Sequence, residues 1–115
     1  MVIDLTPEDV AKRLEAGEII LIDVREPHEY QEARIPGALL HALSTFEPAA
    51  LPVDGTREVV LHCKVGGRSA RAVEACQAAG LPVNAHLAGG IGAWADAGLP
   101  VDRMDSATGR MVRST

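Results

Sequence analysis

The sequence predicts an α/β fold with a small central parallel sheet and helices on both faces. Two short apolar runs, residues 19–24 and 58–62, have the composition of strands buried on both faces, which is typical of parallel sheets. Segments rich in helix formers and helix-capping residues alternate with these runs. With 115 residues, of which 47% are hydrophobic, the chain suits one domain with a single core.

The first helix is predicted to begin after Thr6. We expect Thr6 as its N-cap, Pro7 as the first helical residue and Asp9 as the acidic residue of a capping box. Gly17 is expected to close this helix. A short apolar piece at Val2 and Ile3 precedes this helix, and the strand at 19–24 follows it.

Charged residues at the end of this buried strand need an explanation. Asp23 and Arg25 lie on either side of Val24 at that end. One interpretation is a structural Asp–Arg pair or a capping carboxylate. The other is a role facing substrate, because the strand ends of a parallel sheet face one crevice. The sequence leaves both interpretations open.

The middle of the chain is predicted to contain short elements. Pro27 is placed to start a short helix, and the turn at 35–38 leads into a strand at 39–41. A short helix is predicted from Ser44 to Leu51, followed by a loop up to Thr56. These elements connect the two apolar strands.

One cysteine lies where a strand ends and a helix begins. The strand is predicted at 58–62 and the helix at 69–79, which places Cys63 at the carboxyl end of the sheet, where open α/β folds bind ligands. Gly66 and Gly67 allow successive backbone N–H groups to point at one centre and hold an anion.

These surroundings predict a reactive thiolate. The loop amides, the positive end of the helix and the cations Lys64 and Arg68 all favour the ionised form of Cys63. The alternative is an unreactive cysteine buried at a strand end. Cys76 lies on the apolar face of the following helix, and we expect it in the core rather than as a resolving thiol.

The C-terminal part is predicted to hold one more strand and one more helix. The strand at 82–87 is expected to be the last, and a short helix opens after Gly89. Residues 90–95 match a loose dinucleotide pattern, which we reject because too little chain follows for the rest of that motif. Residues 102–115 are polar and predict a loosely ordered tail, leaving 1–101 as the domain.

Composition and charge exclude several classes of ligand. A formal net charge of −5 and one residue each of Phe, Trp and Tyr provide neither a phosphate-binding surface nor a base-stacking platform, so nucleic acid is not expected. The sequence has no membrane-spanning run and no targeting pattern, so we expect a soluble cytoplasmic protein. Two cysteines are too few for a disulfide framework, and no spacing indicates a metal site.

The histidines show no ligand-like spacing. We interpret all of them as structural or surface residues. His62 precedes Cys63 on a strand and should therefore point to the opposite side. A Cys–His pair assembled in space from His28, His41 or His86 remains an open alternative.

Taken together, several segments resemble the single-domain rhodaneses. In chain order they are Asp23 to Tyr30, Ile35 to Ala38, Cys63 to Arg68, and Leu87 to Gly90 with Ala93-Trp94 and Gly98 to Val101. The resemblance covers the chain from Val2 to Val101 and implies a rhodanese-like sheet with helices on both faces. Ala33-Arg34 replaces the Gly-His pair of many rhodaneses, which affects a turn away from the cysteine.

The resemblance implies sulfurtransferase chemistry. Cys63 would be the catalytic nucleophile, taking a sulfane sulfur from thiosulfate or a similar small anionic donor and passing it from a persulfide to cyanide or a thiol. Asp23 and Arg25 would support the site, and Arg68 would either bind the donor or brace the loop. No cofactor, metal, nucleic acid or membrane is implied. The implied substrate-binding residues are Lys64, Val65, Gly66, Gly67, Arg68 and Ser69.

Other functions and donors stay open at this point. Cys63 and Arg68 enclose four residues, one fewer than in the related cysteine phosphatases and arsenate reductases, which disfavours a phosphate substrate. A low-turnover persulfide carrier or regulatory sulfur-binding module would use the same residues. Mercaptopyruvate and glutathione persulfide are alternative donors, although Lys64 and the lack of a Gly-Val-Thr continuation favour thiosulfate. We expect a monomer or a weak homodimer.

Overall fold

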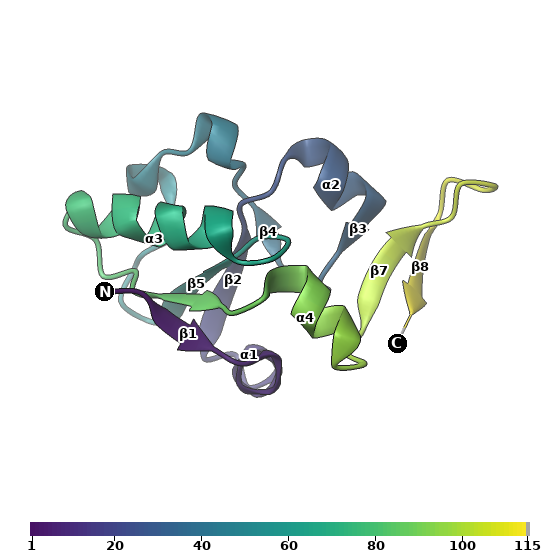
Figure 1. The fold of residues 1–115 in the computed structure, drawn as a ribbon, viewed down its shortest axis with the longest axis horizontal. Helices are drawn as coiled ribbons and strands as arrows, with labels where there is room; N and C mark the ends of the chain where they lie inside the picture. The colour runs from purple at the N-terminus through teal and green to yellow at the C-terminus, as the bar shows by residue number, and fades with distance from the viewer. Residues whose placement is uncertain (115) are drawn as a thin grey trace.

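The main sheet follows the predicted α/β arrangement in the computed structural model, which describes residues 1–114. Its strands are β1 (Ile3–Leu5), β2 (Ile19–Asp23), β4 (Leu39–Leu40), β5 (Glu58–His62) and β6 (Ala85–Leu87). The spatial order is β1-β6-β5-β2-β4, and every neighbouring pair is parallel (Figure 1). The carboxyl ends of all these strands therefore lie along one edge of the sheet.

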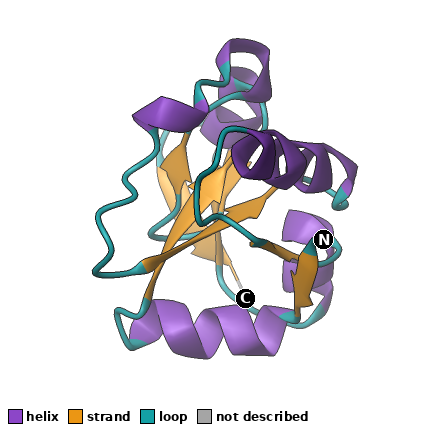
Figure 2. Cartoon of the chain, turned by 90° about the vertical axis from the view of Figure 1, so that its left-hand side faces the viewer, coloured by secondary structure: helices purple, strands orange, loops and turns teal. Residues whose placement is uncertain are grey.

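Helices cover both faces of this sheet. They are α1 (Pro7–Glu15), α2 (Pro27–Glu32), α3 (Gly67–Ala78) and α4 (Gly90–Asp96). Helix α3 lies on one face, and α1 and α4 lie on the other (Figures 1 and 2). Within residues 1–114, no helix has both the length and the apolar character needed to cross a membrane.

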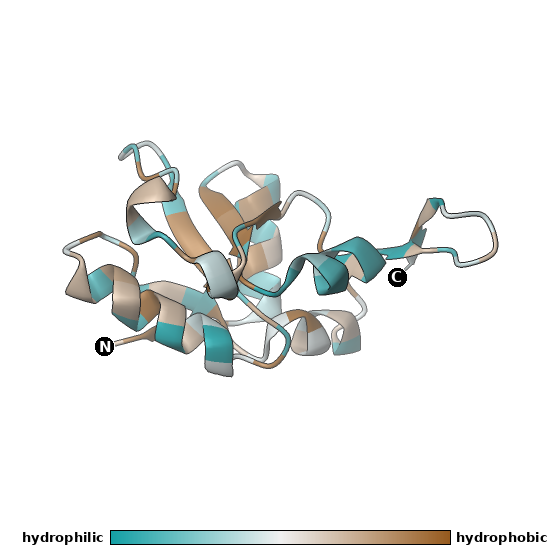
Figure 3. Ribbon diagram, turned by 90° about the horizontal axis from the view of Figure 1, so that it is seen from above, coloured by the Kyte–Doolittle hydropathy of each residue, from teal (hydrophilic) through white to brown (hydrophobic). Residues whose placement is uncertain are grey.

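The alternation of side chains along β2 divides the core into two clusters. Ile19 and Leu21 pack with Trp94 on the face covered by α1 and α4, whereas Ile20 and Ile22 pack with Val73 of α3. Every residue of β2 is buried, as expected for a central parallel strand. Accordingly, the central strands are among the most hydrophobic parts of the ribbon (Figure 3).

The predicted start of the first helix is confirmed. Thr6 has extended backbone angles, and its Oγ1 accepts a hydrogen bond of 3.1 Å from the backbone N–H of Asp9. Pro7 is the first residue of α1. Gly17, with φ of 73°, follows the C-cap and ends the helix in the left-handed conformation.

The helix predicted from Ser44 to Leu51 is wrong. The structure has two 3-10 turns instead, Leu43–Thr45 and Pro48–Ala50. Pro48 has no N–H to donate, and it holds Glu47 before it in an extended conformation, with φ of −124° and ψ of 101°. One continuous helix is therefore interrupted at this proline.

Residues 101–114 form a hairpin where the sequence indicated a loosely ordered tail. Strands β7 (Val101–Met104) and β8 (Met111–Ser114) pair antiparallel, and β7 also pairs with β3 (Ala33–Arg34). The hairpin projects from the end of the molecule that carries α2 (Figure 1). The prediction that 82–87 is the last strand is also wrong, because β7 and β8 have no buried apolar run to indicate them.

Candidate active site

Cys63 lies between β5 and α3, at the carboxyl edge of the sheet. Cys63 is 1% exposed, whereas the next two residues, Lys64 and Val65, are exposed and form the rim of the loop. Gly66 is the N-cap of α3 and has φ of 116°, which an L side chain rarely adopts. The glycine thus turns the chain tightly from the rim into the helix.

The loop directs hydrogen-bond donors at the sulfur. The backbone N–H of Gly66 donates to Cys63 Sγ at 3.1 Å and that of Ser69 at 3.4 Å. The Ser69 hydroxyl oxygen lies 3.5 Å from the same sulfur. Burial raises the pKa of Cys63, but bonds from the Ser69 side chain and the loop amides outweigh burial, so the pKa lies below that of an ordinary thiol.

Helix α4 holds this loop from behind. The N–H of Ile91 donates to the Cys63 carbonyl at 2.9 Å, and the N–H of Gly92 donates to the Lys64 carbonyl at 3.0 Å. A Cβ on Gly90 would lie 2.3 Å from the Cys63 carbonyl oxygen. Because α4 binds the carbonyls, the amides of the loop remain free to face the sulfur. This contact between distant segments was not predicted from the sequence.

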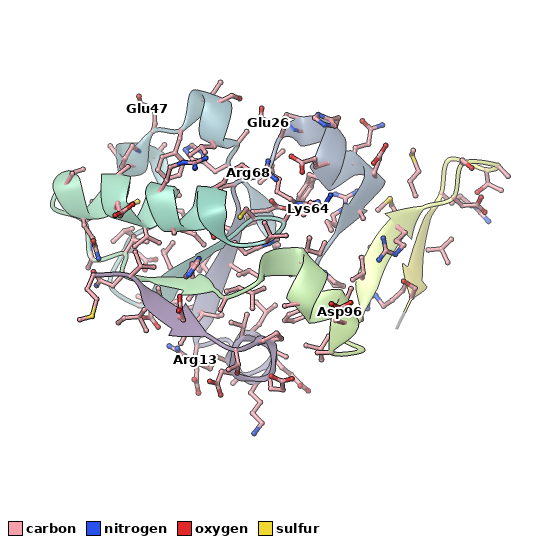
Figure 4. The ribbon with its side chains drawn as sticks, viewed as in Figure 1. Arg13, Glu26, Glu47, Lys64, Arg68 and Asp96 are labelled. Carbon is pink, nitrogen blue, oxygen red and sulfur yellow. The ribbon has the colours of Figure 1, made fainter. Side chains whose placement is uncertain are left out.

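Arg68 is bound to a carboxylate on α2. Its Nη1 and Nη2 donate to the two carboxylate oxygens of Glu29 at 2.7 and 3.0 Å. The hydrogen bonds from Arg68 hold the pKa of Glu29 at about 2, against the opposing effect of partial burial. Lys64 and Arg68 lie at the same end of the sheet, beside α2 (Figure 4). In this geometry Arg68 braces the first turn of α3 through Glu29.

Asp23 and Arg25 pair with each other at the end of β2. Asp23 is fully buried, and its carboxylate accepts from Arg25 Nε at 3.1 Å and from Arg25 Nη2 at 2.8 Å. Arg25 Nη2 also donates to the carbonyl of Ala33 at 2.6 Å. The pair thereby ties the end of β2 to the start of β3. Arg25 also lines a cavity beside the cysteine loop.

That cavity has a volume of about 340 Å³ and is lined by charged side chains from three parts of the chain. Lys64 comes from the rim, Arg103 from the hairpin, and Glu32 from α2. Arg103 belongs to the segment that the sequence indicated as a tail, so its position was missed. Among residues 1–114, no group of three or more His, Cys, Asp or Glu side chains is arranged to bind a metal ion.

A second missed feature lies behind Ser69. The Ser69 hydroxyl oxygen is 2.8 Å from His86 Nδ1, and His86 Nε2 is 2.7 Å from a carboxylate oxygen of Asp4. The sequence predicts a structural or surface role for His86 and leaves a Cys–His pair open; the structure connects His86 to Cys63 through Ser69. No local pattern indicates this link, because Asp4 and His86 are 82 residues apart.

The second cysteine is in the core, as predicted. Cys76 is 0% exposed and packs in the cluster under α3. Burial raises the pKa of its thiol, and no opposing effect is present. The two cysteines of this chain therefore differ in the direction of their pKa shifts.

A cysteine with backbone N–H donors, between a parallel strand and a helix, defines a class of α/β domains built around a thiol whose pKa is lowered. Residues 6–97 match the family described as Rhodanese-like domain, and the chain belongs to this family. The family match covers the main sheet from β2 to β6, the cysteine loop and α4, and leaves β1 outside. This agrees with the resemblance noted in the sequence.

Known proteins similar to this chain include both short and long ones. A protein named sulfurtransferase from Allochromatium vinosum is 32% identical over 102 residues, which are 88% of this chain and 95% of that protein. The probable adenylyltransferase/sulfurtransferase MoeZ of Mycobacterium tuberculosis is 43% identical over 96 residues, 79% of this chain but 24% of that protein. The chain spans less than two thirds of the length of several other curated relatives.

One solved structure is similar over nearly the whole chain. The crystal structure of thiosulfate sulfurtransferase from Pseudomonas aeruginosa superposes with a TM-score of 0.80 at 27% sequence identity. The superposition covers 96% of this chain and 22% of that one. The fold of this chain therefore corresponds to one part of that larger protein.

Proposed function

We propose that this chain is a sulfurtransferase that takes a sulfane sulfur from thiosulfate and carries it as a persulfide on Cys63. The observation that carries the proposal is the pair of backbone N–H donors to Cys63 Sγ, from Gly66 at 3.1 Å and from Ser69 at 3.4 Å. Such donors stabilise a negative charge on sulfur both before and after the transfer. The names of the Allochromatium and Pseudomonas relatives support the same chemistry.

The reaction proceeds in two displacements on sulfur. The Cys63 thiolate attacks the outer sulfur of thiosulfate, so that a new S–S bond forms on Cys63 while the S–S bond of thiosulfate breaks and its electron pair leaves with sulfite. Cyanide or a thiolate then attacks the outer sulfur of the persulfide. That step releases thiocyanate or a new persulfide and regenerates the Cys63 thiolate.

The charges near the loop favour an anionic donor. Lys64 and Arg103 line the same cavity, and neither forms an ion pair with another described residue at 4.0 Å or less. A dianion such as thiosulfate is attracted by these cations before it reaches the sulfur. Glu29 and Glu32 are the opposing charges in the cavity, and Glu29 is already paired with Arg68.

The test is intact-protein mass spectrometry before and after thiosulfate, followed by cyanide and an assay for thiocyanate. We expect one added sulfur on Cys63, repeated removal by cyanide, and initial rates that follow ping-pong kinetics. A Cys76→Ala variant serves as the control and should behave like the unchanged protein. Failure of thiosulfate, mercaptopyruvate and glutathione persulfide alike to add sulfur would refute the proposal.

A low-turnover carrier is the second candidate, and the 1% exposure of Cys63 favours it. Burial slows the attack of free small acceptors, whereas a protein partner that docks on the rim of the loop would hold its thiol beside this sulfur. Fast multiple turnover with cyanide and small thiols would eliminate this candidate. A cytoplasmic location and a monomeric or weakly dimeric state belong to the main proposal; sedimentation of the purified chain tests the second of these.

A further inference from the structure

Four side chains from four segments form a continuous chain of contacts that ends at the surface. Cys63 Sγ is 3.5 Å from Ser69 Oγ, which is 2.8 Å from His86 Nδ1, and His86 Nε2 is 2.7 Å from Asp4 Oδ1. Cys63, Ser69 and His86 are buried, whereas the Asp4 side chain is 72% exposed. The chain of contacts thus runs from the buried Cys63 sulfur to the exposed Asp4 carboxylate on β1.

The Ser69 hydroxyl oxygen accepts from the Cys63 thiol at 3.5 Å, and its one hydrogen has two neighbours that accept it. These acceptors are the Gly66 carbonyl at 3.2 Å and His86 Nδ1 at 2.8 Å. The Asp4 carboxylate requires a proton on His86 Nε2. With a neutral imidazole, Nδ1 is bare and takes the Ser69 hydrogen. With an imidazolium, Nδ1 donates to Ser69 instead, and the hydroxyl hydrogen is free to stabilise the thiolate.

We propose that Ser69, His86 and Asp4 form a proton relay that ionises Cys63. The thiol proton passes to Ser69 Oγ as the hydroxyl proton passes to His86 Nδ1. The products are a Cys63 thiolate, an intact Ser69 hydroxyl and an imidazolium held by the Asp4 carboxylate, so protons and charge balance. His86 and Asp4 are positioning residues, because they act on the sulfur only through Ser69.

Burial of the thiol favours such a route. Cys63 is 1% exposed, so its thiol proton has little direct contact with bulk water. The charged and titratable groups facing His86 are Asp4 from β1 and, through Ser69 of α3, Cys63. No Lys or Arg within residues 1–114 is paired with Asp4, so that carboxylate is available to the imidazolium.

The test is the rate of Cys63 alkylation by iodoacetamide against pH, followed on the Cys63 peptide by mass spectrometry. We expect His86→Gln to raise the midpoint by about one pH unit and to slow alkylation at pH 7 about tenfold. Asp4→Asn should shift the profile the same way by about threefold in rate at pH 7. His28→Gln, at an exposed histidine on α2, is the matched control and should leave the profile unchanged.

Double variants separate a relay from independent effects. Because His86 acts through Ser69, Ser69→Ala combined with His86→Gln should slow alkylation no more than Ser69→Ala alone. Losses that multiply, or a His86→Gln profile that coincides with the unchanged protein, would overturn the relay. If His86→Gln does not fold, as judged by circular dichroism, Asp4→Asn at an exposed position decides alone. The relay gives the proposed sulfurtransferase its nucleophile, yet alkylation needs no sulfur donor, so either proposal is able to fail separately.

Discussion

Helix α3 has a cysteine at each end, and the two ends give sulfur opposite chemistry. Cys63 precedes the N-terminus and Cys76 lies in the last turn, with exposures of 1% and 0%. The pKa of Cys63 is lowered, whereas that of Cys76 is raised. Burial is the same at both ends. What differs is whether N–H and O–H donors point at the sulfur.

The polarity of a helix explains part of this difference. The first turn of α3 presents free N–H groups and a partial positive charge, worth about 0.3–1 kcal/mol to an anion, whereas the last turn presents carbonyls. The loop adds the Gly66 amide and the Ser69 hydroxyl at the N-terminal end alone. A cysteine becomes a nucleophile through its hydrogen bonds, and the following variants test this conclusion.

Substitution of each cysteine in turn should give the largest difference in activity between the two ends of α3. Cys63→Ser is expected to lower thiocyanate formation by about a thousandfold or more, because a hydroxyl is not ionised near neutral pH. Cys76→Ala should keep the rate within about twofold. Steady-state assays with thiosulfate and cyanide measure both. Equal losses in the two variants would mean that the ends of α3 do not differ in function.

The next largest effect is expected from Gly90→Ala on α4, which disturbs the cysteine loop at the N-terminal end of α3. The new Cβ would lie 2.3 Å from the Cys63 carbonyl oxygen and 2.6 Å from the Lys64 carbonyl carbon. We expect a loss of about 1–3 kcal/mol in the free energy of unfolding and, as the loop shifts, a fall of about 10- to 100-fold in activity.

Gly80→Ala is the matched control at the other end of α3. Gly80 has φ of 77°, but a Cβ there would contact nothing within 4 Å. It should cost about 1 kcal/mol from backbone strain and leave activity unchanged. Urea unfolding and the thiocyanate assay compare the two glycines. Equal activity in both variants would show that the contact with α4 does not position the loop.

Glu29→Gln tests the ion pair that braces the first turn of α3. We expect a loss of about 1 kcal/mol in unfolding free energy at pH 7, because the bidentate pair is partly buried. The pKa of Glu29 is about 2 in the folded chain against an ordinary value of 4.5, so its contribution is complete above about pH 5. The contribution falls as the pH drops toward 2.

The measurement is urea unfolding of both proteins at pH 7, 4 and 3, with Glu74→Gln, at an exposed glutamate of α3, as control. The difference between the unchanged protein and Glu29→Gln should shrink with decreasing pH. A difference that is independent of pH would assign the effect to packing instead of to the ion pair.

The smallest effect on the free energy of unfolding is expected at Cys76, in the last turn of α3. Cys76→Ala removes about one methylene-sized group from the core and should cost about 0.8 kcal/mol. Because the Cys76 thiol is neutral at pH 7, this cost should not change between pH 6 and 8. Thermal unfolding at those pH values measures it. Rapid alkylation of Cys76 in the native protein would contradict its place in the core.

Local patterns were enough to predict the frame of the site. The cap at Thr6, the buried strands at 19–24 and 58–62, and the strand–loop–helix unit around Cys63 are each encoded within about ten residues of sequence. The family resemblance added the order of these units. The strand and the helix that flank Cys63 could therefore be located from the sequence alone.

The partners of the site could not be predicted, because they are far apart in sequence. Glu29 lies 39 residues before Arg68, and Asp4 lies 82 residues before His86. The hairpin was missed for a different reason: β8 is exposed throughout and has no apolar alternation. Arg103 lines the cavity only because β7 pairs with β3.

The pairing of β1 with β6 also has a consequence for folding. β1 is an edge strand, and within residues 1–114 it pairs only with β6, which follows much later in the chain. Such a non-local contact is slow to form, because the entropy of closing a long loop is lost before the strand pairing stabilises the chain. We therefore expect the contact between Asp4 and His86 to form late in folding. We expect the nascent chain to hold Cys63 as an unreactive thiol until this last strand docks.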